Sequence, residues 1–397
     1  MRLRIPAYAV VVLVAARATY ASCPHEESTK IIPLPVWGTD PNQGTTWGAM
    51  PVFVRVCPDD QRTHWVLAPS ITWNSVIHLS GTVRFYDYPS RDTTITVIGG
   101  ASTRINYRVV LMRDHLPTAP GAWTDDSFLR IEHDAFARFF GMGPDSPSSG
   151  ESTYTAEHVI ATERRGLNLG DHWNLGAGLG IDRENVAPMG VKSLPLAPEL
   201  YPDVPGMRRP SFVFWQGLDL RYDDRDGGDY ADAGMWLDAG LAVVEGLQGS
   251  PSFVKGGVQG RWLIPELPWL SAAARVAYTG MSAHDAPFYL QSTLGGSFVL
   301  RGFATGRFYA QQAWTAEVEQ RIRAWRMHAL GVRVDWHVDP FITAGQVFDR
   351  LGDLADNPQL AAGVGLRAFV HPNIVGRVDL AEGGEGLKIY VEIGYPY

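Results

Sequence analysis

The chain has 397 residues, and its 34 Lys and Arg against 42 Asp and Glu give a formal net charge of −8 at pH 7. Because nucleic acids are polyanions that bind basic surfaces, this balance argues against a nucleic-acid partner. Hydrophobic residues make up 45% and charged residues 19% of the chain, and its 42 glycines are spread along it without a low-complexity linker. We therefore expect one large domain rather than several joined modules.

The N-terminus has the pattern of a secretory signal peptide. A basic start (residues 1–4) precedes an apolar run (residues 5–16), and small residues follow at Thr19 and Ala21. This order predicts a signal peptide over residues 1–21. No later segment has the ~18 consecutive apolar residues of a transmembrane helix. Any membrane-spanning part must then consist of strands.

Residues 22–46 are expected as a short periplasmic or lumenal segment, followed by a first strand from Trp47 to Cys57. The chain has two cysteines, Cys23 and Cys57. An oxidising periplasm would allow them to pair. A single strand ending at Cys57 would, however, carry it across the membrane and away from Cys23. The sequence leaves the pairing open and favours separate cysteines.

From Trp47 onward, segments that alternate apolar and polar residues recur between turn residues. Near the C-terminus one such face holds Trp314, Ala316, Val318 and Ile322, and the opposite face holds Thr315, Glu317, Glu319, Arg321 and Arg323. One apolar and one charged face is the pattern of a transmembrane β-barrel with lipid outside and water inside. A midplane Arg or Lys facing lipid costs ~2–4 kcal/mol, so the charged faces must line the lumen.

The barrel domain is assigned to residues 47–397. Five strands are predicted after Gly306, at residues 311–323, 329–348, 361–371, 373–381 and 386–397. The stretch before it leaves room for ten or eleven more, at about 22 residues per strand and connection. Because bacterial barrels favour even numbers, sixteen strands are expected. Surface loops are expected at residues 117–126, 143–152, 186–209 and 280–306.

The last strand closes the barrel against the first. Its alternation of apolar and polar residues continues to Tyr397, an aromatic residue suited to the membrane interface. Gly394 weakens strand pairing, and Pro396 lacks an N–H donor for the ladder. These three residues predict a weak seam between the first and last strands.

The loop before the terminal strands contains Leu300-Arg301-Gly302-Phe303. Here the chain resembles the bacterial surface antigen family, the barrel superfamily of the outer-membrane protein assembly factor and the translocation and assembly module. The family hallmark is an aliphatic-Arg-Gly-aromatic tetrapeptide on a long loop folded back into the barrel. Further segments similar to family motifs lie in the same order at residues 41–48, 139–143, 224–226, 319–321, 340–348, 363–367 and 377–380.

The resemblance implies that Arg301 meets an acidic residue on each of two neighbouring strands. Glu319, in the Glu319-Gln320-Arg321 segment, fits the first position. Thr343 stands where the family usually has the second acid, and Asp335 or Asp339 on the same strand would substitute. Gly302 permits a tight backbone, and Phe303 is expected to wedge the loop against the wall.

The resemblance also implies a role in inserting or translocating proteins, or lipid-linked cargo, at the Gram-negative outer membrane. Family members that handle client proteins carry periplasmic polypeptide-transport-associated domains, and here a barrel without that arm is expected. A passive channel and a structural envelope protein remain alternatives. Expected partners are outer-membrane lipids, with client outer-membrane proteins or an envelope lipoprotein as candidates, and the barrel is expected to be monomeric.

No enzymatic chemistry is expected. The acidic run at residues 223–229 lacks the downstream Glu of a calcium loop. His115, His133 and His158 have no metal-ligand spacing, and the sequence contains neither a nucleophile elbow nor a Walker loop. We therefore predict no catalytic residues, no metal and no cofactor.

Overall fold

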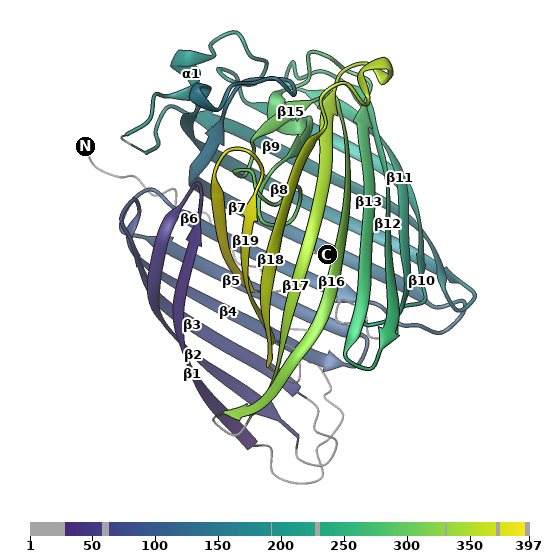
Figure 1. Ribbon diagram of the computed structural model, residues 1–397. Coiled ribbons are helices and arrows are strands. Elements are labelled where there is room, and N and C mark those ends of the chain that lie inside the picture. The colour runs from purple at the N-terminus through teal and green to yellow at the C-terminus, as the bar shows by residue number, and fades with distance from the viewer. Residues whose placement is uncertain are drawn as a thin grey trace.

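The computed structural model describes residues 28–57, 63–191, 193–226, 231–329, 332–370 and 374–393. Its main element is one 18-stranded sheet that curls into a barrel (Figure 1). Each strand pairs antiparallel with the next from β1 to β13, β13 then pairs with β16, and the order continues to β20. The expected all-β transmembrane barrel is confirmed.

The first nine strands are β1 (Ser28–Asp40), β2 (Gly44–Val56), β3 (Thr63–Asn74), β4 (His78–Ser90), β5 (Thr93–Ser102), β6 (Tyr107–His115), β7 (Trp123–Phe139), β8 (Ser152–Leu169) and β9 (Trp173–Ala187). The other wall strands are β10 (Ser211–Asp223), β11 (Gly234–Leu247), β12 (Phe253–Leu267), β13 (Leu270–Met281), β16 (Gln312–Ala329), β17 (Val332–Phe348), β18 (Gln359–Val370), β19 (Ile374–Glu382) and β20 (Leu387–Ile393). No helix in the described ranges is both long enough and apolar enough to cross a bilayer.

The expected count of sixteen strands was too low. The five terminal strands lie at the expected places, although β16 continues six residues beyond the predicted end at residue 323, to Ala329. Thirteen wall strands precede the long loop, because several of β2 to β6 are short and joined by tight turns. One of the additional strands is β1, which occupies part of the segment 22–46 that was expected to lie outside the wall. Pro33 and Pro35 disguise it in the sequence, since proline is unusual in strands away from sheet edges.

The position of β1 also corrects the expectation for the cysteines. Cys57 is disulfide-bonded, and Cys23 is the only other cysteine of the chain. The chain crosses the wall twice before Cys57, so Val56 returns to a place directly opposite Ser28. The predicted separation of the cysteines assumed one crossing and was wrong. Cys23, the signal peptide (residues 1–21) and the seam residues Gly394, Pro396 and Tyr397 lie outside the described residues.

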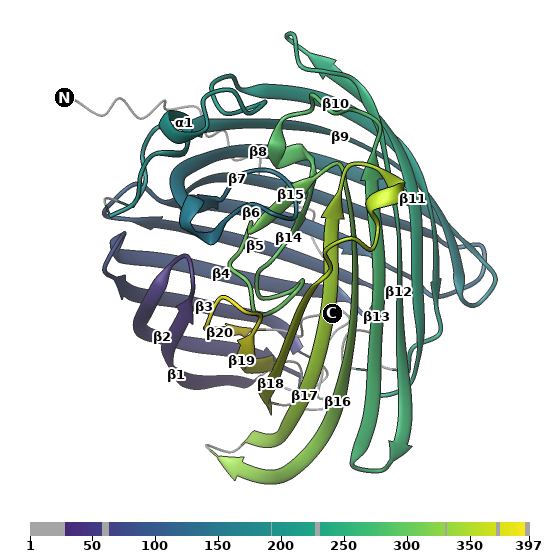
Figure 2. The ribbon, with the colours of Figure 1, turned by 45° about the horizontal axis from the view of Figure 1, so that its top comes forward.

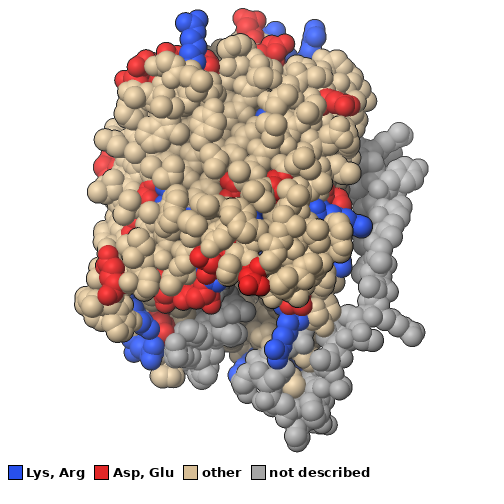
Figure 3. Space-filling model, turned by 90° about the vertical axis from the view of Figure 1, so that its right-hand side faces the viewer, with Lys and Arg blue, Asp and Glu red and all other residues tan. Residues whose placement is uncertain are grey.

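The two faces of the terminal strands point as expected. Val318 and Ile342 are 60% and 65% exposed on the outer face, whereas Glu319 and Asp339 are fully buried inside. Figure 3 shows one side of the wall as a mostly uncharged surface, with charged side chains at both rims and some at mid-height. The outer face is thus mostly apolar and the lumen charged, as a membrane barrel requires.

The long loop between β13 and β16 lies inside the ring of wall strands (Figure 2). It contains a small hairpin of β14 (Ser292–Leu294) and β15 (Phe308–Ala310), which pair with each other and not with the wall. Short helices, α1 (Ala197–Leu200), η1 (Ser148–Gly150), η3 (Phe288–Leu290) and η4 (Leu351–Asp353), belong to the longer loops. Leu300, Phe303 and Phe308 of the inserted loop form an apolar cluster with Ala361 of β18.

Candidate functional site

The tip of the inserted loop has a backbone that only particular residues permit. Gly302 has φ +119°, and a Cβ built there would lie 2.6 Å from the Cβ of Ala361. Leu300 has φ +52°, which is uncommon for a residue with a branched apolar side chain. The tip therefore lies directly against β18, and glycine at position 302 makes this approach possible.

Arg301 projects from this tip into a group of acidic side chains on two wall strands. Its Nη2 donates to Glu317 Oε1 at 2.6 Å and to Glu319 Oε2 at 2.9 Å, and its Nη1 donates to Asp379 Oδ1 at 3.3 Å. The guanidinium carbon also lies 3.5 Å from the ring centroid of Phe341 on β17. Arg301 is fully buried, and a desolvated cation requires such partners to be stable there.

Further arginines of the wall share these acids. Arg367 Nη1 lies 2.6 Å from Asp379 Oδ1, and Arg377 Nη1 lies 2.8 Å from Asp379 Oδ2. Arg321 Nε lies 3.3 Å from Glu319 Oε1. We call the four arginines and the four acids the lumenal charge network; its members are Arg301, Arg321, Arg367, Arg377, Glu317, Glu319, Asp339 and Asp379. The equal numbers of opposite charges explain how so many ions remain buried.

The predicted partners of Arg301 are only partly those found. Glu319 contacts it as expected, and Arg321 joins the network through Glu319. Asp339 instead lies 3.5 Å from Arg367 Nε. Asp335 pairs with Arg326, 2.7 Å away. Neither acid of β17 therefore replaces the carboxylate that Thr343 lacks, and that part of the prediction was wrong.

The acid that takes this place is Glu317, which sequence reasoning did not assign to Arg301. Glu317 lies directly opposite Thr343 in the β16–β17 ladder. Directly opposed residues of an antiparallel pair point to the same face, so a carboxylate from either position reaches the same part of the lumen. The sequence did carry a signal for this role. Glu317 is two residues before Glu319, so both side chains point to the same face of the strand.

Phe303 fixes the loop to the last strand. Its ring packs against Phe308 with centroids 5.3 Å apart, and a Cβ at Gly383 would lie 2.5 Å from that ring. The Tyr390 hydroxyl on β20 donates to the Phe303 carbonyl at 2.5 Å. The wedge expected of Phe303 is thus a contact with the turn after β19 and with β20.

The same loop also holds the turn after β1. Asn42 Nδ2 donates to the Thr305 carbonyl at 2.9 Å, and Arg138 Nη2 donates to the Asn42 carbonyl at 2.6 Å. The loop therefore contacts both ends of the wall, β20 through Tyr390 and the β1–β2 turn through Asn42. These two ends adjoin each other, because the Cβ position of Gly38 lies 3.6 Å from the Val391 carbonyl oxygen.

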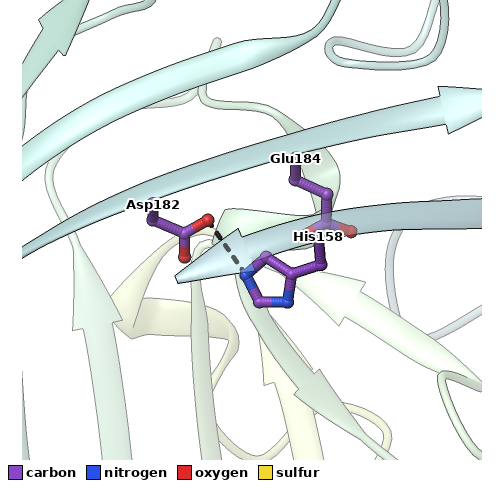
Figure 4. A group of neighbouring side chains, drawn as sticks. All are labelled: His158, Asp182 and Glu184. Atoms are coloured by element: carbon purple, nitrogen blue, oxygen red, sulfur yellow. Dashed lines mark hydrogen bonds and ion pairs between the residues drawn. The ribbon is translucent and has the colours of Figure 1, made fainter. Parts of the chain in front are cut away.

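A second lumenal group consists of three side chains whose spacing in the sequence matches no metal-binding motif. His158 of β8 and Asp182 and Glu184 of β9 have potential ligand atoms within 4.8 Å of one another (Figure 4). His158 Nε2 lies 3.0 Å from Asp182 Oδ1, and Arg130 Nη2 lies 2.8 Å from His158 Nδ1. The arginine guanidinium can only donate hydrogen bonds, so Nδ1 is the acceptor and Nε2 carries the hydrogen. With both ring nitrogens engaged, this group does not fit a metal ion as it stands.

The fold and the buried loop define a class of protein, an outer-membrane β-barrel whose lumen is occupied by an arginine-bearing loop. The model of the Omp85 superfamily domain matches residues 117–370. The chain belongs to the Omp85 superfamily. No curated relative matches the chain by sequence.

A solved structure of BamA has the same fold, and CdiB is a more distant match. BamA from Haemophilus ducreyi lacking POTRA domains 1–3 is 14% identical, with a TM-score of 0.54, and the match covers 92% of this chain and 74% of that chain. CdiB from Acinetobacter baumannii is 11% identical, with a TM-score of 0.45, and the match covers 92% of this chain and 59% of that chain. At these identities the likeness concerns the fold alone.

Proposed function

We propose that this protein assists the insertion or translocation of proteins, or of lipid-linked cargo, at the outer membrane of a Gram-negative cell, and that cargo engages it at the boundary of β1 and β20. The role involves no chemical reaction. The observation that carries the proposal is that the edge of β1 facing β20 lacks backbone N–H donors.

Two prolines determine that edge. Pro33 lies directly opposite Pro51 in the β1–β2 ladder. A directly opposed antiparallel pair either exchanges both N–H···O bonds or has both backbones turned away from each other. Since proline has no N–H, this pair is of the second kind, and Pro33 turns its backbone toward β20. Pro35 is two residues farther along and turns its backbone the same way, so the edge facing β20 lacks two N–H donors.

The pairing between β1 and β20 agrees with this. Within residues 28–40 and 387–393 no ladder joins the two strands, whereas every other neighbouring pair of wall strands forms one. An edge poor in donors separates at lower cost than a complete ladder. A strand edge that can be exposed is also a template for pairing with an incoming strand, which is what an insertion role requires.

The experiment is the insertion of an unfolded client barrel into liposomes, with and without this protein. We expect acceleration by the wild type and its loss in Arg301→Ala, because the inserted loop contacts both strands at the boundary. Arg326→Ala is the matched control. Arg326 of β16 forms an ion pair with Asp335 of β17, and neither residue belongs to the lumenal charge network. No acceleration by folded wild-type protein would reject the proposal.

A passive channel is the second candidate. A cavity of about 560 Å³ is lined by charged side chains that include Arg164, Asp219, Arg221 and Asp238. Lumenal charges of this kind set ion preference in open barrels. Large, steady single-channel conductance together with no client insertion would favour this function instead.

A further inference from the structure

Five polar side chains lie on the outer face of β6, β7 and β8. Arg165 of β8 is opposite Asp125 of β7, Glu163 is opposite Ser127, and Ser127 is opposite Arg113 of β6. Opposed residues share a face, and the Arg165 side chain is 75% exposed, so all five point outward. We call Arg113, Asp125, Ser127, Glu163 and Arg165 the midwall cluster.

The midwall cluster holds two bases and two acids that contact one another. Arg113 forms an ion pair with Asp125. Ser127 Oγ donates to Glu163 Oε2 at 2.5 Å, and Arg165 Nε lies 3.6 Å from Glu163 Oε1. The cluster is therefore neutral as a whole, while each of its charges remains partly exposed.

On β8 the midwall cluster lies inside the apolar band, while Arg113 and Asp125 lie nearer the short-turn ends of β6 and β7. Toward the short turns, Leu167 and the exposed rings of Trp123 and Trp173 restore an apolar surface with an aromatic girdle. Toward the long loops, Ala161 and its neighbours do the same, up to the next polar level at Glu157. On β8, twelve residues separate Leu169, which lies opposite Trp173, from Glu157, and Glu163 is at the midpoint. Twelve residues correspond to roughly 28 Å at about 3.3 Å per residue and a ~45° tilt.

Another part of the wall shows that the chain can build an unbroken apolar surface. On β12 and β13 the outward pairs are Val258 with Tyr278, Gly260 with Val276, Trp262 with Ala274 and Ile264 with Ala272. This run holds no charged side chain through the same band. The polar side chains of β6–β8 thus interrupt a band that is apolar on β12 and β13.

We propose that the midwall cluster is the contact surface for a second copy of this chain within the membrane. Charged groups that face acyl chains are costly, and a partner removes that cost by supplying opposite charges at the same depth. A two-fold axis along the membrane normal brings the cluster of one copy to that of the other at equal height. Two bases beside two acids make such a surface complementary to itself.

Lipid headgroups fit this surface less well. They lie at the edges of the apolar band, whereas Glu163 and Arg165 lie well inside it. An anionic headgroup also requires an excess of positive charge, and the cluster has none. The proposal replaces the monomer expected from the sequence, and it does not depend on the proposed function.

A groove beside the midwall cluster gives the second copy room to pack. Its volume is about 720 Å³, with Glu163 and Arg165 on one side, Leu241 and Val243 on the other, and Ala177 between them. The small side chain of Ala177 allows close approach of a neighbouring wall. Apolar side chains of the second copy can therefore pack in this groove, next to the polar contacts of the midwall cluster.

The test is the mass of the purified full chain in lipid nanodiscs large enough for two barrels. The wild type is expected as a dimer, and Arg165→Glu is expected to weaken dimerisation at least about tenfold. The double variant Glu163→Arg with Arg165→Glu exchanges the two charges and should restore the dimer. Gln320→Glu, a charge change on the outer face of β16, should leave it unchanged.

A cross-linking measurement on wild-type background removes any dependence on the folding of the charge variants. Leu167→Cys places a thiol beside the midwall cluster, and Val276→Cys places one on β13, away from the cluster. A short bis-maleimide should link two copies through position 167 and not through 276. A wild type that stays monomeric at high density in the nanodisc, with or without bound anionic lipid, would overturn the proposal, as would linkage through position 276 alone.

Discussion

Arg301 and Glu317 are 16 residues apart in the chain and joined by two hydrogen bonds, Nη2 to Oε1 at 2.6 Å and Nε to Oε2 at 3.2 Å. Through this contact, Glu317 of β16 supplies a carboxylate to Arg301 in the part of the lumen that the uncharged Thr343 of β17 faces. Thr343 Oγ1 is buried and has no hydrogen-bond partner among the described residues. The charge expected on one strand is thus supplied by the residue directly opposite on its neighbour.

The first prediction exchanges these two residues. Glu317→Thr should lower the free energy of unfolding by about 3–5 kcal/mol, because it removes one partner of a buried charge. Adding Thr343→Glu should recover much of that loss, since the new carboxylate enters the same part of the lumen. The measurement is denaturant unfolding of the purified barrel. A double variant no more stable than Glu317→Thr would show that the two positions are not equivalent.

The second prediction concerns the sign and shape of the charge at position 301. Arg301→Glu should lower the temperature at which the folded barrel loses its anomalous gel mobility by more than Arg301→Ala does, because it adds a fourth acid to three. Arg301→Lys should cost least, since it keeps the charge but loses the planar fork. Equal melting of all four proteins would mean that the charge network does not hold the loop.

The third prediction tests the backbone of the loop tip. Gly302→Ala should destabilise the barrel by about 1–3 kcal/mol from its φ of +119° alone, with a further cost from contact with Ala361. Ala361→Gly should recover only the contact part. Gly81→Ala is the control, because a Cβ there meets nothing within 4 Å. Thermal unfolding of Gly302→Ala, of Gly302→Ala with Ala361→Gly, and of Gly81→Ala separates the two contributions.

The fourth prediction follows from the disulfide of Cys57. Peptide mapping of the non-reduced protein should yield one linked pair that contains Cys23 and Cys57, since the chain has no third cysteine. Cys57→Ser should raise the rate of proteolysis in the β1–β2 hairpin. A disulfide restricts the unfolded chain, and its loss should lower the free energy of unfolding by about 2–4 kcal/mol. Recovery of Cys57 as a free thiol would contradict the structure.

Much of the barrel was predictable because its signal is periodic. The alternation of Glu317, Glu319 and Arg321 with Val318 and Gln320 fixed both the strand and its inward face. The tetrapeptide at residues 300–303 located the inserted loop. These are local patterns, and a strand of period two carries them in the sequence.

The misses have a common physical origin in pairing between strands. The roles of Glu317 and Asp379 depend on which residues face each other across ladders, and no local pattern encodes that register. Pro33 and Pro35 hid β1, since their missing donors are tolerated only at the boundary with β20. Once β1 was missed, the side on which Cys57 emerges was wrong as well.

The proposed function depends most on the boundary of β1 and β20, and one measurement tests this boundary directly. Gly38→Cys and Glu392→Cys, joined by a short bis-maleimide, would tie the two strands together, while Val258→Cys and Tyr278→Cys would tie the complete β12–β13 ladder as a control. Client insertion into liposomes is then compared for the two linked proteins. We predict that linking β1 to β20 abolishes the acceleration and that linking β12 to β13 leaves it intact. Equal activity of both linked proteins would contradict a role for this boundary.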